Sequence, residues 1–271
     1  MAAANPTRTG AAPAAPAIPP LAVSGVSKVF GQEDGRPVEV IRSVSLEIAR
    51  GEIVSIVGPS GCGKTTLLNL LCGLLPASSG AVLWFGREIQ GVPPRLGYML
   101  QKDLLLPWRT AIENVALGLQ VKGVARRART AQSRELLDKL GLAGFADYYP
   151  SALSGGMRQR VALARTLAPD PEVLMLDEPF SALDFQTKIL IERDTARLVR
   201  GEHRSLLLIT HDVEEAVTLS DRVIVLSHRP CVVRSEHRIE LPVDRTDMMA
   251  ARDTREFGSY VRRIWTELDI H

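Results

Sequence analysis

The stretch GPSGCGKTT, from Gly58 to Thr66, decides the fold of this chain, and it comes directly after the apolar run IVSIV. It satisfies the pattern G-x-x-x-x-G-K-[ST] through Gly58, Gly63, Lys64 and Thr65. Glycines allow backbone N–H groups to turn toward phosphate oxygens, and the N-terminus of a following helix favours an anion. Because a strand-like run precedes the loop and helical residues follow it, we predict a phosphate-binding loop rather than a Gly-rich turn that matches by chance.

The residue types in this loop indicate how it would hold a nucleotide. The Lys64 side chain can reach β- and γ-phosphates, and the Thr65 hydroxyl can ligate Mg²⁺. Cys62 is expected to act through its backbone more than through its sulfur. We predict that the nucleotide contacts the whole loop, namely Gly58, Pro59, Ser60, Gly61, Cys62, Gly63, Lys64, Thr65 and Thr66.

The composition is that of an ordinary globular protein. The chain has 271 residues, 45% of them hydrophobic and 24% charged, which allows one large domain or two small ones. Its net charge of +2 is too small to indicate a nucleic-acid partner. We find no apolar stretch of the roughly 18 residues that a membrane-spanning helix needs.

The N-terminus and the cysteines suggest a cytosolic protein. Residues 1–20 are rich in Ala and Pro and lack the continuous apolar segment of a signal peptide, so we expect a disordered tail. Cys62, Cys72 and Cys231 are the only cysteines. Such a sparse, odd count fits a reducing compartment better than a disulfide framework.

Strand and helix patterns alternate along most of the chain. Residues 23–30 and 38–48 are predicted strands joined by a polar turn, and IVSIV, VLMLD, SLLLIT and RVIVLS are predicted buried strands. Helical patterns separate the buried strands, which favours a mostly parallel α/β sheet. A long helical section, roughly 112–167, interrupts the alternation and is predicted to be an inserted subdomain. Its basic piece is interpreted as a solvated helix face.

Two further strand ends carry polar side chains that suit nucleotide chemistry. Asp177 and Glu178 end the run VLMLDEP, and ligands bind at this end of the strands in open α/β sheets. We predict that Asp177 holds Mg²⁺ and that Glu178 orients or deprotonates an attacking water. His211 follows SLLLIT in the same way and could bond the γ-phosphate or the water. The alternatives are an exposed acidic turn and an isolated His at a strand end.

A second anion site is predicted at the segment LSGGMRQR. Ser154, Gly155 and Gly156 stand at the start of a predicted helix, where N–H groups favour an anion. One phosphate loop does not obviously need a second such site. A symmetric dimer explains it if this segment closes over the nucleotide of the other subunit. The alternative is a plain helix cap.

Together these motifs resemble the ATP-binding subunit of an ABC transporter over roughly residues 21–227. GPSGCGKTT resembles the Walker A loop, LSGGMRQR the signature and VLMLDEP the Walker B strand. The resemblance implies an α/β P-loop NTPase (RecA-like) core with an N-terminal antiparallel β subdomain and an inserted α-helical subdomain. The ATPase domain would span 21–230, with its helical subdomain at about 102–167, and 231–271 would be an extension packed on the core.

The resemblance also implies roles for single residues. Asp184 in SALD is similar to the D-loop, and Gln101 in YMLQKD is similar to the Q-loop glutamine, which touches Mg²⁺ and water. Phe30 stands where the family stacks an aromatic ring on adenine, although a strand-end core residue is the alternative. The implied catalytic residues are Glu178, His211, Lys64 and Gln101, and the implied metal ligands are Thr65, Gln101 and Asp177.

A narrower resemblance is to importers of nitrate, sulfonate and taurine. It rests on LLPWRTAIENVALGL, DEPFSALD, THDVEEAVTLSDRVIVLSHRP and the ending REFGSYVRRIWTEL. The chain departs from this group at Cys231, where a Gly is usual after HRP, and its LPVDRTD segment also differs. Both departures concern only which solute is transported and not how the nucleotide is bound.

The resemblance implies a Mg-dependent ATPase that works as a homodimer at the cytoplasmic face of the inner membrane. Its partners would be membrane permease subunits and, indirectly, a solute-binding protein, with no nucleic acid. The segment 102–114 would contact the permease, although packing against the helical subdomain is an alternative. A soluble ABC clamp on nucleic acid or the ribosome is the rival function, and a non-hydrolysing regulatory cassette is a third.

Overall fold

The computed structural model describes residues 18–31, 36–181, 183–245 and 247–268. Of the predicted N-terminal tail, only 18–20 lie within the described residues. A six-stranded sheet forms the centre, in the order β10-β9-β3-β8-β7-β6, and its strands are parallel except for β10. Its strands are β3 (Ile53–Val57), β6 (Leu96–Met99), β7 (Val173–Asp177), β8 (Ser205–Ile209), β9 (Arg222–Leu226) and β10 (Val233–Arg238). Every residue of β3, β7 and β8 is buried, as expected of strands covered on both faces.

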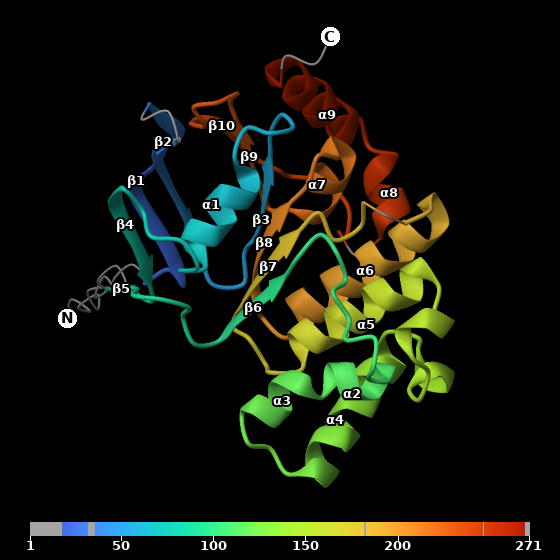
Figure 1. The fold of residues 1–271 in the computed structure, drawn as a ribbon. Coiled ribbons are helices and arrows are strands. Elements are labelled where there is room, and N and C mark those ends of the chain that lie inside the picture. The colour runs from blue at the N-terminus through green and yellow to red at the C-terminus, as the bar shows by residue number, and fades with distance from the viewer. Residues whose placement is uncertain (1–17, 32–35, 182, 246, 269–271) are drawn as a thin grey trace, which may run out of the picture.

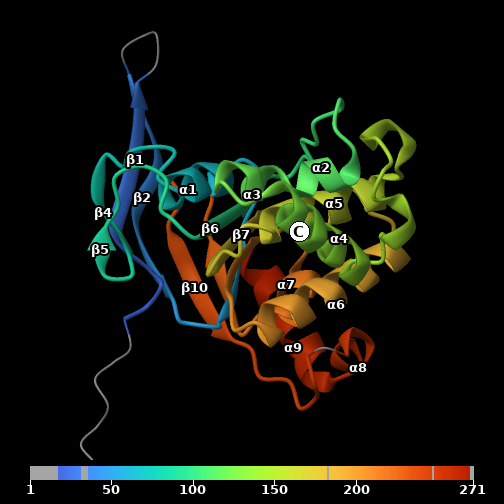
Figure 2. The ribbon, with the colours of Figure 1, turned by 90° about the horizontal axis from the view of Figure 1, so that it is seen from below.

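A second, antiparallel sheet lies beside the first and has the order β2-β1-β4-β5. It consists of β1 (Leu21–Gly31), β2 (Pro37–Ile48), β4 (Ser79–Trp84) and β5 (Arg87–Glu88). Helix α1 (Lys64–Leu71) lies between the two sheets, and Figure 2 shows the antiparallel sheet as a separate layer. The Trp84 indole donates to the carbonyl of Leu71 at 3.1 Å, which joins this sheet to α1.

Helix α1 ends inside the apolar run LLNLLCGLL, which spans residues 67–75. The helix ends with Cys72 as its C-cap, and Gly73 follows with φ of 69°. A Cβ at position 73 would lie 1.9 Å from the carbonyl oxygen of Gly91, so only glycine fits there. The backbone at Gly73 thus turns the chain out of the helix although the residues on both sides are apolar.

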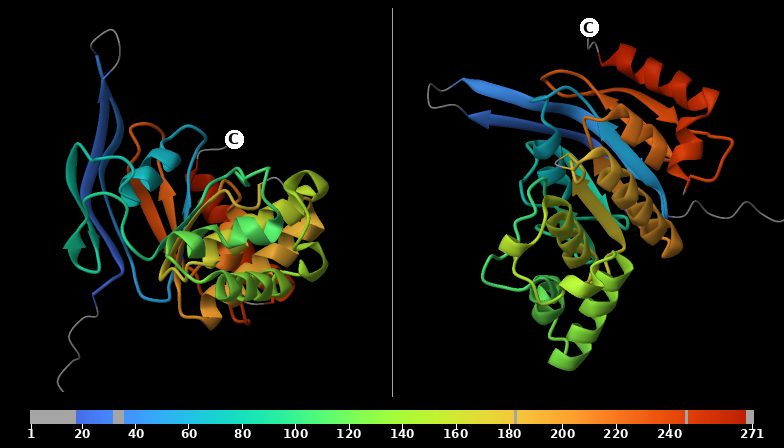
Figure 3. Two further views of the ribbon diagram at one scale, coloured as in Figure 1. Left: turned by 60° about the horizontal axis from the view of Figure 1, so that its bottom comes forward. Right: turned by 90° about the vertical axis from the view of Figure 1, so that its right-hand side faces the viewer.

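The predicted helical section is present and consists of separate helices joined by turns. They are α2 (Ala111–Val115), α3 (Leu117–Val121), α4 (Arg126–Lys139) and α5 (Gly155–Leu167), with 3₁₀ turns at Ala143–Phe145 and Pro150–Ala152. Only Ser133 and Leu137 of α4 are buried, so its basic face is solvated as predicted. Figure 1 places α3 and α4 at the end of the molecule opposite to α9 (Arg255–Glu267), and Figure 3 confirms this from the side.

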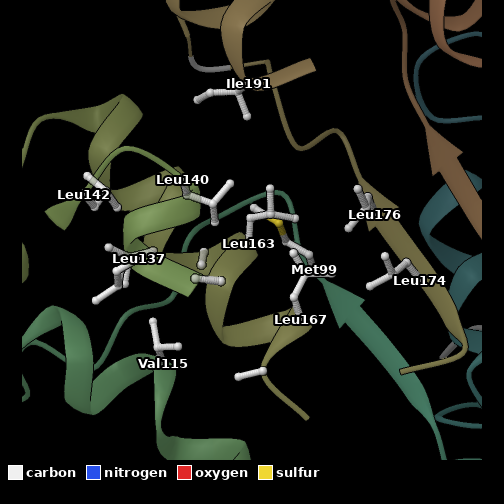
Figure 4. Packing of buried hydrophobic residues seen from close by; sticks show 14 of the residues in the cluster. Met99, Val115, Leu137, Leu140, Leu142, Leu163, Leu167, Leu174, Leu176 and Ile191 are labelled. Atoms are coloured by element: carbon white, nitrogen blue, oxygen red, sulfur yellow. The ribbon is translucent and has the colours of Figure 1, made fainter. Parts of the chain in front are cut away.

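One hydrophobic cluster joins the helical subdomain to the central sheet. Figure 4 shows Leu137 at the end of α4, Leu163 of α5 and Leu176 of β7 within it. Met99 of β6 and Ile191 of α6 (Phe185–Gly201) belong to the same cluster. Helix α5 contacts both α2 and α4 of the helical subdomain and β6 of the central sheet, so it links the subdomain to the sheet that carries the strand-end residues.

The C-terminal region packs on the same core. Strand β10 pairs with β9, and α9 packs on α7 (Val213–Leu219), while α8 (Met248–Arg252) contacts both of these helices. Phe257, Ile264 and Leu268 share a buried cluster with Val57 of β3. In the part of the chain that the structure describes, no helix has both the length and the apolar character that crossing a membrane requires.

Candidate nucleotide-binding site

The loop 58–63 connects β3 to α1, as the sequence pattern predicts. Gly61 and Gly63 have φ of 74° and 124°, values that residues other than glycine rarely adopt. A Cβ at Gly63 would lie 3.0 Å from Val40 Cγ1 and 3.1 Å from Ile41 Cδ1, so β2 also requires glycine there. The Lys64 ammonium donates to the carbonyl of Gly58 at 2.8 Å and is held inside the loop.

The loop borders an open pocket of about 710 Å³. Gln101, Glu178 and His211 also line it, so residues predicted from four separate stretches of sequence lie together. The full lining is Gly58, Pro59, Ser60, Gly61, Gly63, Lys64, Thr65, Thr66, Gln101, Glu178, His211, Arg229, Trp265 and Leu268. Cys62 is the predicted loop residue that does not line the pocket, because its side chain is turned into the core.

Asp177, the predicted metal ligand, does not line the pocket but lies directly behind Thr65, which does. The Thr65 hydroxyl donates to Asp177 Oδ2 at 3.2 Å, although 112 residues separate them. Asp177 is 5% exposed, and burial raises its pKa against the opposing effects of the Thr65 hydroxyl and the Lys64 charge. A hydroxyl and a carboxylate are the hard oxygen donors that Mg²⁺ prefers, so these two residues could hold that ion beside a phosphate.

Glu178 lies between two polar partners at the ends of neighbouring strands. Gln101 Nε2 donates to Glu178 Oε2 at 3.0 Å, and His211 Nδ1 lies 3.1 Å from the same oxygen. These three residues follow β6, β7 and β8, which are adjacent and parallel. Glu178 has φ of 46°, and its backbone N–H donates to Ile209 at 2.8 Å, which fixes the turn that aims the carboxylate into the pocket.

Besides Cys62, four residues predicted to contact the nucleotide do not line this pocket, namely Phe30, Ser154, Gly155 and Gly156. Ser154 caps α5, and its hydroxyl accepts from the Met157 backbone N–H at 3.2 Å. Neither it nor the following glycines line the pocket, and a Cβ at Gly156 would lie 2.7 Å from Thr187 Cγ2. Phe30 is also absent from the lining, and the Lys28 ammonium lies 5.1 Å from its ring centroid. The roles predicted for these residues stay predictions.

Comparison with known proteins places the chain in a family. The model of the ABC transporter family matches residues 41–181. An uncharacterized ABC transporter ATP-binding protein, MJ0412 of Methanocaldococcus jannaschii, is 41% identical over 246 residues, which cover 90% of this chain and 89% of that protein. This chain belongs to the ABC transporter ATP-binding proteins. The taurine import ATP-binding protein TauB of Yersinia pestis is 43% identical over 205 residues, covering 76% of this chain and 80% of that protein.

Solved structures of ABC cassettes share the fold of this cassette. The bacterial ABC transporter cassette MJ0796, in a dimeric structure, matches with a TM-score of 0.74 and 31% identity over 81% of this chain and 99% of that one. A dimeric post-hydrolysis structure of MJ0796 bound to ADP and Pi matches with a TM-score of 0.72, 30% identity and the same coverage. The fold is therefore that of a P-loop NTPase cassette, and its family binds and hydrolyses ATP.

The structure adds an ion-pair cluster behind the cassette's site. Lys188 of α6 contacts Asp212 at 2.6 Å and Glu215 at 2.8 Å, both on or beside α7. Asp212 directly follows His211 and caps α7 by accepting from the Glu215 N–H at 3.1 Å. Lys188 therefore connects α6, which Asp184 caps, with the turn that carries His211.

Sequence reasoning did not find Lys188, Arg229 or Trp265. The ion-pair partners of Lys188, Asp212 and Glu215, lie 24 and 27 positions further along the chain. A single Lys in a helical sequence does not indicate such distant partners. Arg229 donates to the Gly61 carbonyl at 3.2 Å, and Trp265 reaches the pocket from the other end of the chain. Only the family resemblance indicated that the C-terminal region, which contains α9, packs on the core.

The buried carboxylates of this cluster predict a pH effect on stability. Burial raises the pKa of Glu215 to about 7, from an ordinary value of 4.5, although Lys188 opposes it. The folded chain then binds a proton that the unfolded chain releases between these values, so this group's contribution to the free energy of unfolding falls as pH rises through that window. The Gln side chain of Glu215→Gln does not titrate, so the variant should not show this pH-dependent loss of stability. The melting temperature of the variant minus that of the wild type should therefore increase from pH 5 to pH 8.

Differential scanning fluorimetry across that range checks this prediction. Glu135→Gln, on the exposed face of α4, is the control for removing a surface carboxylate. A difference that stays constant or decreases with pH would contradict the assigned direction for Glu215.

Proposed function

We propose that this cassette is the Mg-dependent ATPase subunit that energises import of a small solute through separate membrane subunits. The observation that carries the proposal is the convergence of Gln101, Glu178 and His211 on one pocket with the phosphate loop. The solute would be nitrate-, sulfonate- or taurine-like, as the sequence resemblance implies, and the taurine import protein TauB among the relatives supports this class. The solute would bind the membrane subunits and a solute-binding protein, not this chain.

In this proposal each residue of the pocket has one task. The loop N–H groups and the Lys64 ammonium bind the β- and γ-phosphates. On binding, Lys64 exchanges its hydrogen bond to the Gly58 carbonyl for one to a phosphate oxygen. Thr65, Asp177 and Gln101 would hold Mg²⁺, which neutralises charge on the phosphates. Glu178 accepts the proton of the attacking water, while His211 orients that water or the γ-phosphate.

A second copy would complete the site. Ser154, Gly155 and Gly156 do not line their own chain's pocket, although the α5 N-terminus suits an anion. Placed over the γ-phosphate of a partner copy, this N-terminus would stabilise the charge that develops during hydrolysis. The dimeric structures of MJ0796 support this arrangement by similarity.

The segment 102–114 is the proposed contact with the membrane subunits. Leu104 and Trp108 are 53% and 70% exposed, which is unusual for large apolar side chains on one loop. Trp108 also borders a groove of about 610 Å³ between α2 and α4. Asn114 holds the loop in shape by accepting from the Leu106 N–H at 2.8 Å. The cassette would then sit at the cytoplasmic face of the inner membrane.

Trp108→Ala is expected to separate hydrolysis from transport. The isolated chain should hydrolyse ATP at the wild-type rate because Trp108 does not line the nucleotide pocket. Solute uptake by cells should fall by roughly tenfold or more if the membrane subunits bury Trp108, because a few buried aromatic side chains supply most of the binding energy of an interface. Val121→Ala is the matched control, since Val121 is 81% exposed on α3. If Trp108→Ala takes up solute as fast as Val121→Ala does, segment 102–114 is not the contact with the membrane subunits.

The ATPase activity itself is tested with purified protein. We expect phosphate release from ATP that stops on adding a chelator of Mg²⁺, and a loss of roughly 10²-fold or more in Lys64→Ala, since an electrostatic contact to a reacting phosphate is removed. Hydrolysis that persists in Lys64→Ala would indicate a contaminating ATPase or a different site.

The rival function is a soluble clamp on nucleic acid or the ribosome. Adding DNA, RNA or ribosomes to the purified cassette should leave its ATPase rate unchanged if the proposal is correct. Stimulation by any of these would favour the rival.

A further inference from the structure

The turn that carries His211 determines where its imidazole points, because the side chain itself is largely free. That side chain is 62% exposed, and its Nδ1 lies 3.1 Å from Glu178 Oε2. On the β8 side the sheet holds the turn, since the Thr210 N–H donates to the Ile56 carbonyl at 3.2 Å. On the other side the chain leaves the sheet, and Asp212 is the next residue. The orientation of His211 therefore depends on how Asp212 is held.

Asp212 makes three contacts that fix its position. Its Oδ1 accepts from the Glu215 N–H at 3.1 Å and caps α7. Its backbone N–H donates to the Thr210 hydroxyl at 3.0 Å. Its Oδ2 lies 2.6 Å from the Lys188 ammonium of α6. The contact with Lys188 is the one of these three that reaches outside the segment 210–219.

Lys188 is itself held firmly in place. It lies near the start of α6, where its N–H donates to the Asp184 carbonyl at 2.9 Å. A Cβ at Gly156 would lie 2.7 Å from Thr187 Cγ2, so α5 packs closely against this part of α6. The Lys188 side chain is only 14% exposed, and close packing restricts the rotamers of such a side chain. The ammonium is therefore a fixed point against which Asp212 is placed.

Three carboxylates surround this ammonium, and they are not equivalent. Besides Asp212, Glu215 lies at 2.8 Å and Glu192 at 3.7 Å. Arg252 of α8 also pairs with Glu192, at 3.3 Å. The two short contacts of Lys188 are thus with the acidic groups at the start of α7, and Glu192 on its own helix has a second cation.

The charges of these groups agree with the geometry. Burial lowers the pKa of Lys188, but the carboxylates of Glu215 and Asp212 outweigh burial and raise that pKa above its ordinary value. Burial raises the pKa of Asp212, but the hydrogen bonds from Lys188 and from the Glu215 N–H outweigh burial and lower it. Lys188 and Asp212 are therefore both charged near neutral pH. Loss of the cation would leave the Asp212 carboxylate without its ion-pair partner.

We propose that Lys188 is a positioning residue for His211. By binding Asp212 Oδ2 it fixes the turn 210–212, so that the His211 imidazole keeps its place beside Glu178 and the pocket. Lys188 does not line the pocket, so its effect reaches the reaction only through this turn. The inference rests on the proposed function, in which His211 orients the attacking water or the γ-phosphate.

Lys188→Met, which keeps a long side chain but removes its charge, tests the proposal in purified protein. We expect kcat for ATP hydrolysis to fall by about tenfold or more, since a misplacement of about 1 Å can cost roughly 10²-fold. Affinity for a fluorescent ATP analogue should not change, because the pocket lining is intact. Lys188→Arg should restore most of the rate because it restores the cation. Lys139→Met, at an exposed ion pair of α4, is the matched control and should hydrolyse ATP at the wild-type rate.

A double variant separates positioning from a general loss of structure. His211→Ala should lower kcat by roughly 10²-fold or more. Adding Lys188→Met to it should cause little further loss, because the effects of residues that act through one another are not additive. If the two losses multiply instead, Lys188 does not act through His211 and the inference is overturned.

Other outcomes also decide against the inference. A normal kcat in Lys188→Met overturns it, and so does weaker binding of the ATP analogue by that variant. If His211→Ala hydrolyses ATP at the wild-type rate, the role of His211 in the proposed function fails, and the inference falls with it.

Asp212→Asn covers the case in which Lys188→Met does not fold. The amide oxygen can still cap α7, whereas the ion pair with Lys188 is lost. The same fall in kcat, with unchanged binding of the ATP analogue, supports the proposal. A wild-type rate in Asp212→Asn overturns it.

Discussion

Glu178→Gln is expected to lower the kcat for ATP hydrolysis by roughly 10²–10⁴-fold, the usual contribution of a general base. The amide keeps the shape of the side chain and its contact with Gln101 but cannot accept a proton from water. ATP should still bind, because Glu178 is not among the proposed phosphate ligands. Single-turnover and steady-state phosphate release, together with equilibrium ATP binding, measure the two effects separately.

A matched control for this variant lies on α7. Glu214→Gln makes the same chemical change at an exposed residue three positions after His211, and it should hydrolyse ATP at the wild-type rate. If Glu178→Gln turns over at the normal rate, Glu178 is not the base. If it loses ATP binding as well, its carboxylate supports the pocket rather than the chemistry.

Ser154→Arg is expected to abolish hydrolysis without weakening ATP binding to the single chain. A long cationic side chain at the α5 N-terminus would block the approach of this helix to the partner's nucleotide and remove the cap on Met157. The loss in rate should be at least about 10²-fold, comparable to losing a donor that stabilises a transition-state charge. ATPase assays and ATP binding at concentrations that keep the chain monomeric measure the outcome.

Ser151→Arg is the control for this change, because Ser151 is exposed in the 3₁₀ turn just before α5. It should retain activity. A large loss of monomer affinity for ATP in Ser154→Arg would contradict a role in trans, since this residue does not line the pocket of its own chain.

The strand-end residues were predictable because parallel strands bring distant positions to one edge. Asp177 and His211 each follow a short apolar run, and the phosphate loop follows another. Adjacent parallel strands end at the same side of the sheet, so these side chains had to meet wherever the strands pair. The structure brings Gln101, Glu178 and His211 together at the ends of β6, β7 and β8 in this way.

The features that escaped prediction depend on packing between distant segments. Helix α1 ends early because of the backbone at Gly73, whose close neighbour Gly91 is far along the chain. Lys188 and Trp265 reach the region of the site only after α6 and α9 have packed on the core. Neither helix has a sequence pattern that specifies its position. Phe30 was transferred by resemblance alone, and its place at a strand end does not bring it into the pocket.

The central claim is that two copies of this chain close over ATP. Sedimentation velocity of Glu178→Gln with ATP and Mg²⁺ tests it most directly, because this variant should hold the nucleotide without turning it over. We expect a species of twice the 29.6 kDa chain mass with ATP, and a monomer with ADP. The double variant Glu178→Gln with Ser154→Arg should stay monomeric even with ATP. A chain that stays monomeric with bound ATP, or one that dimerises equally with ADP, would contradict it.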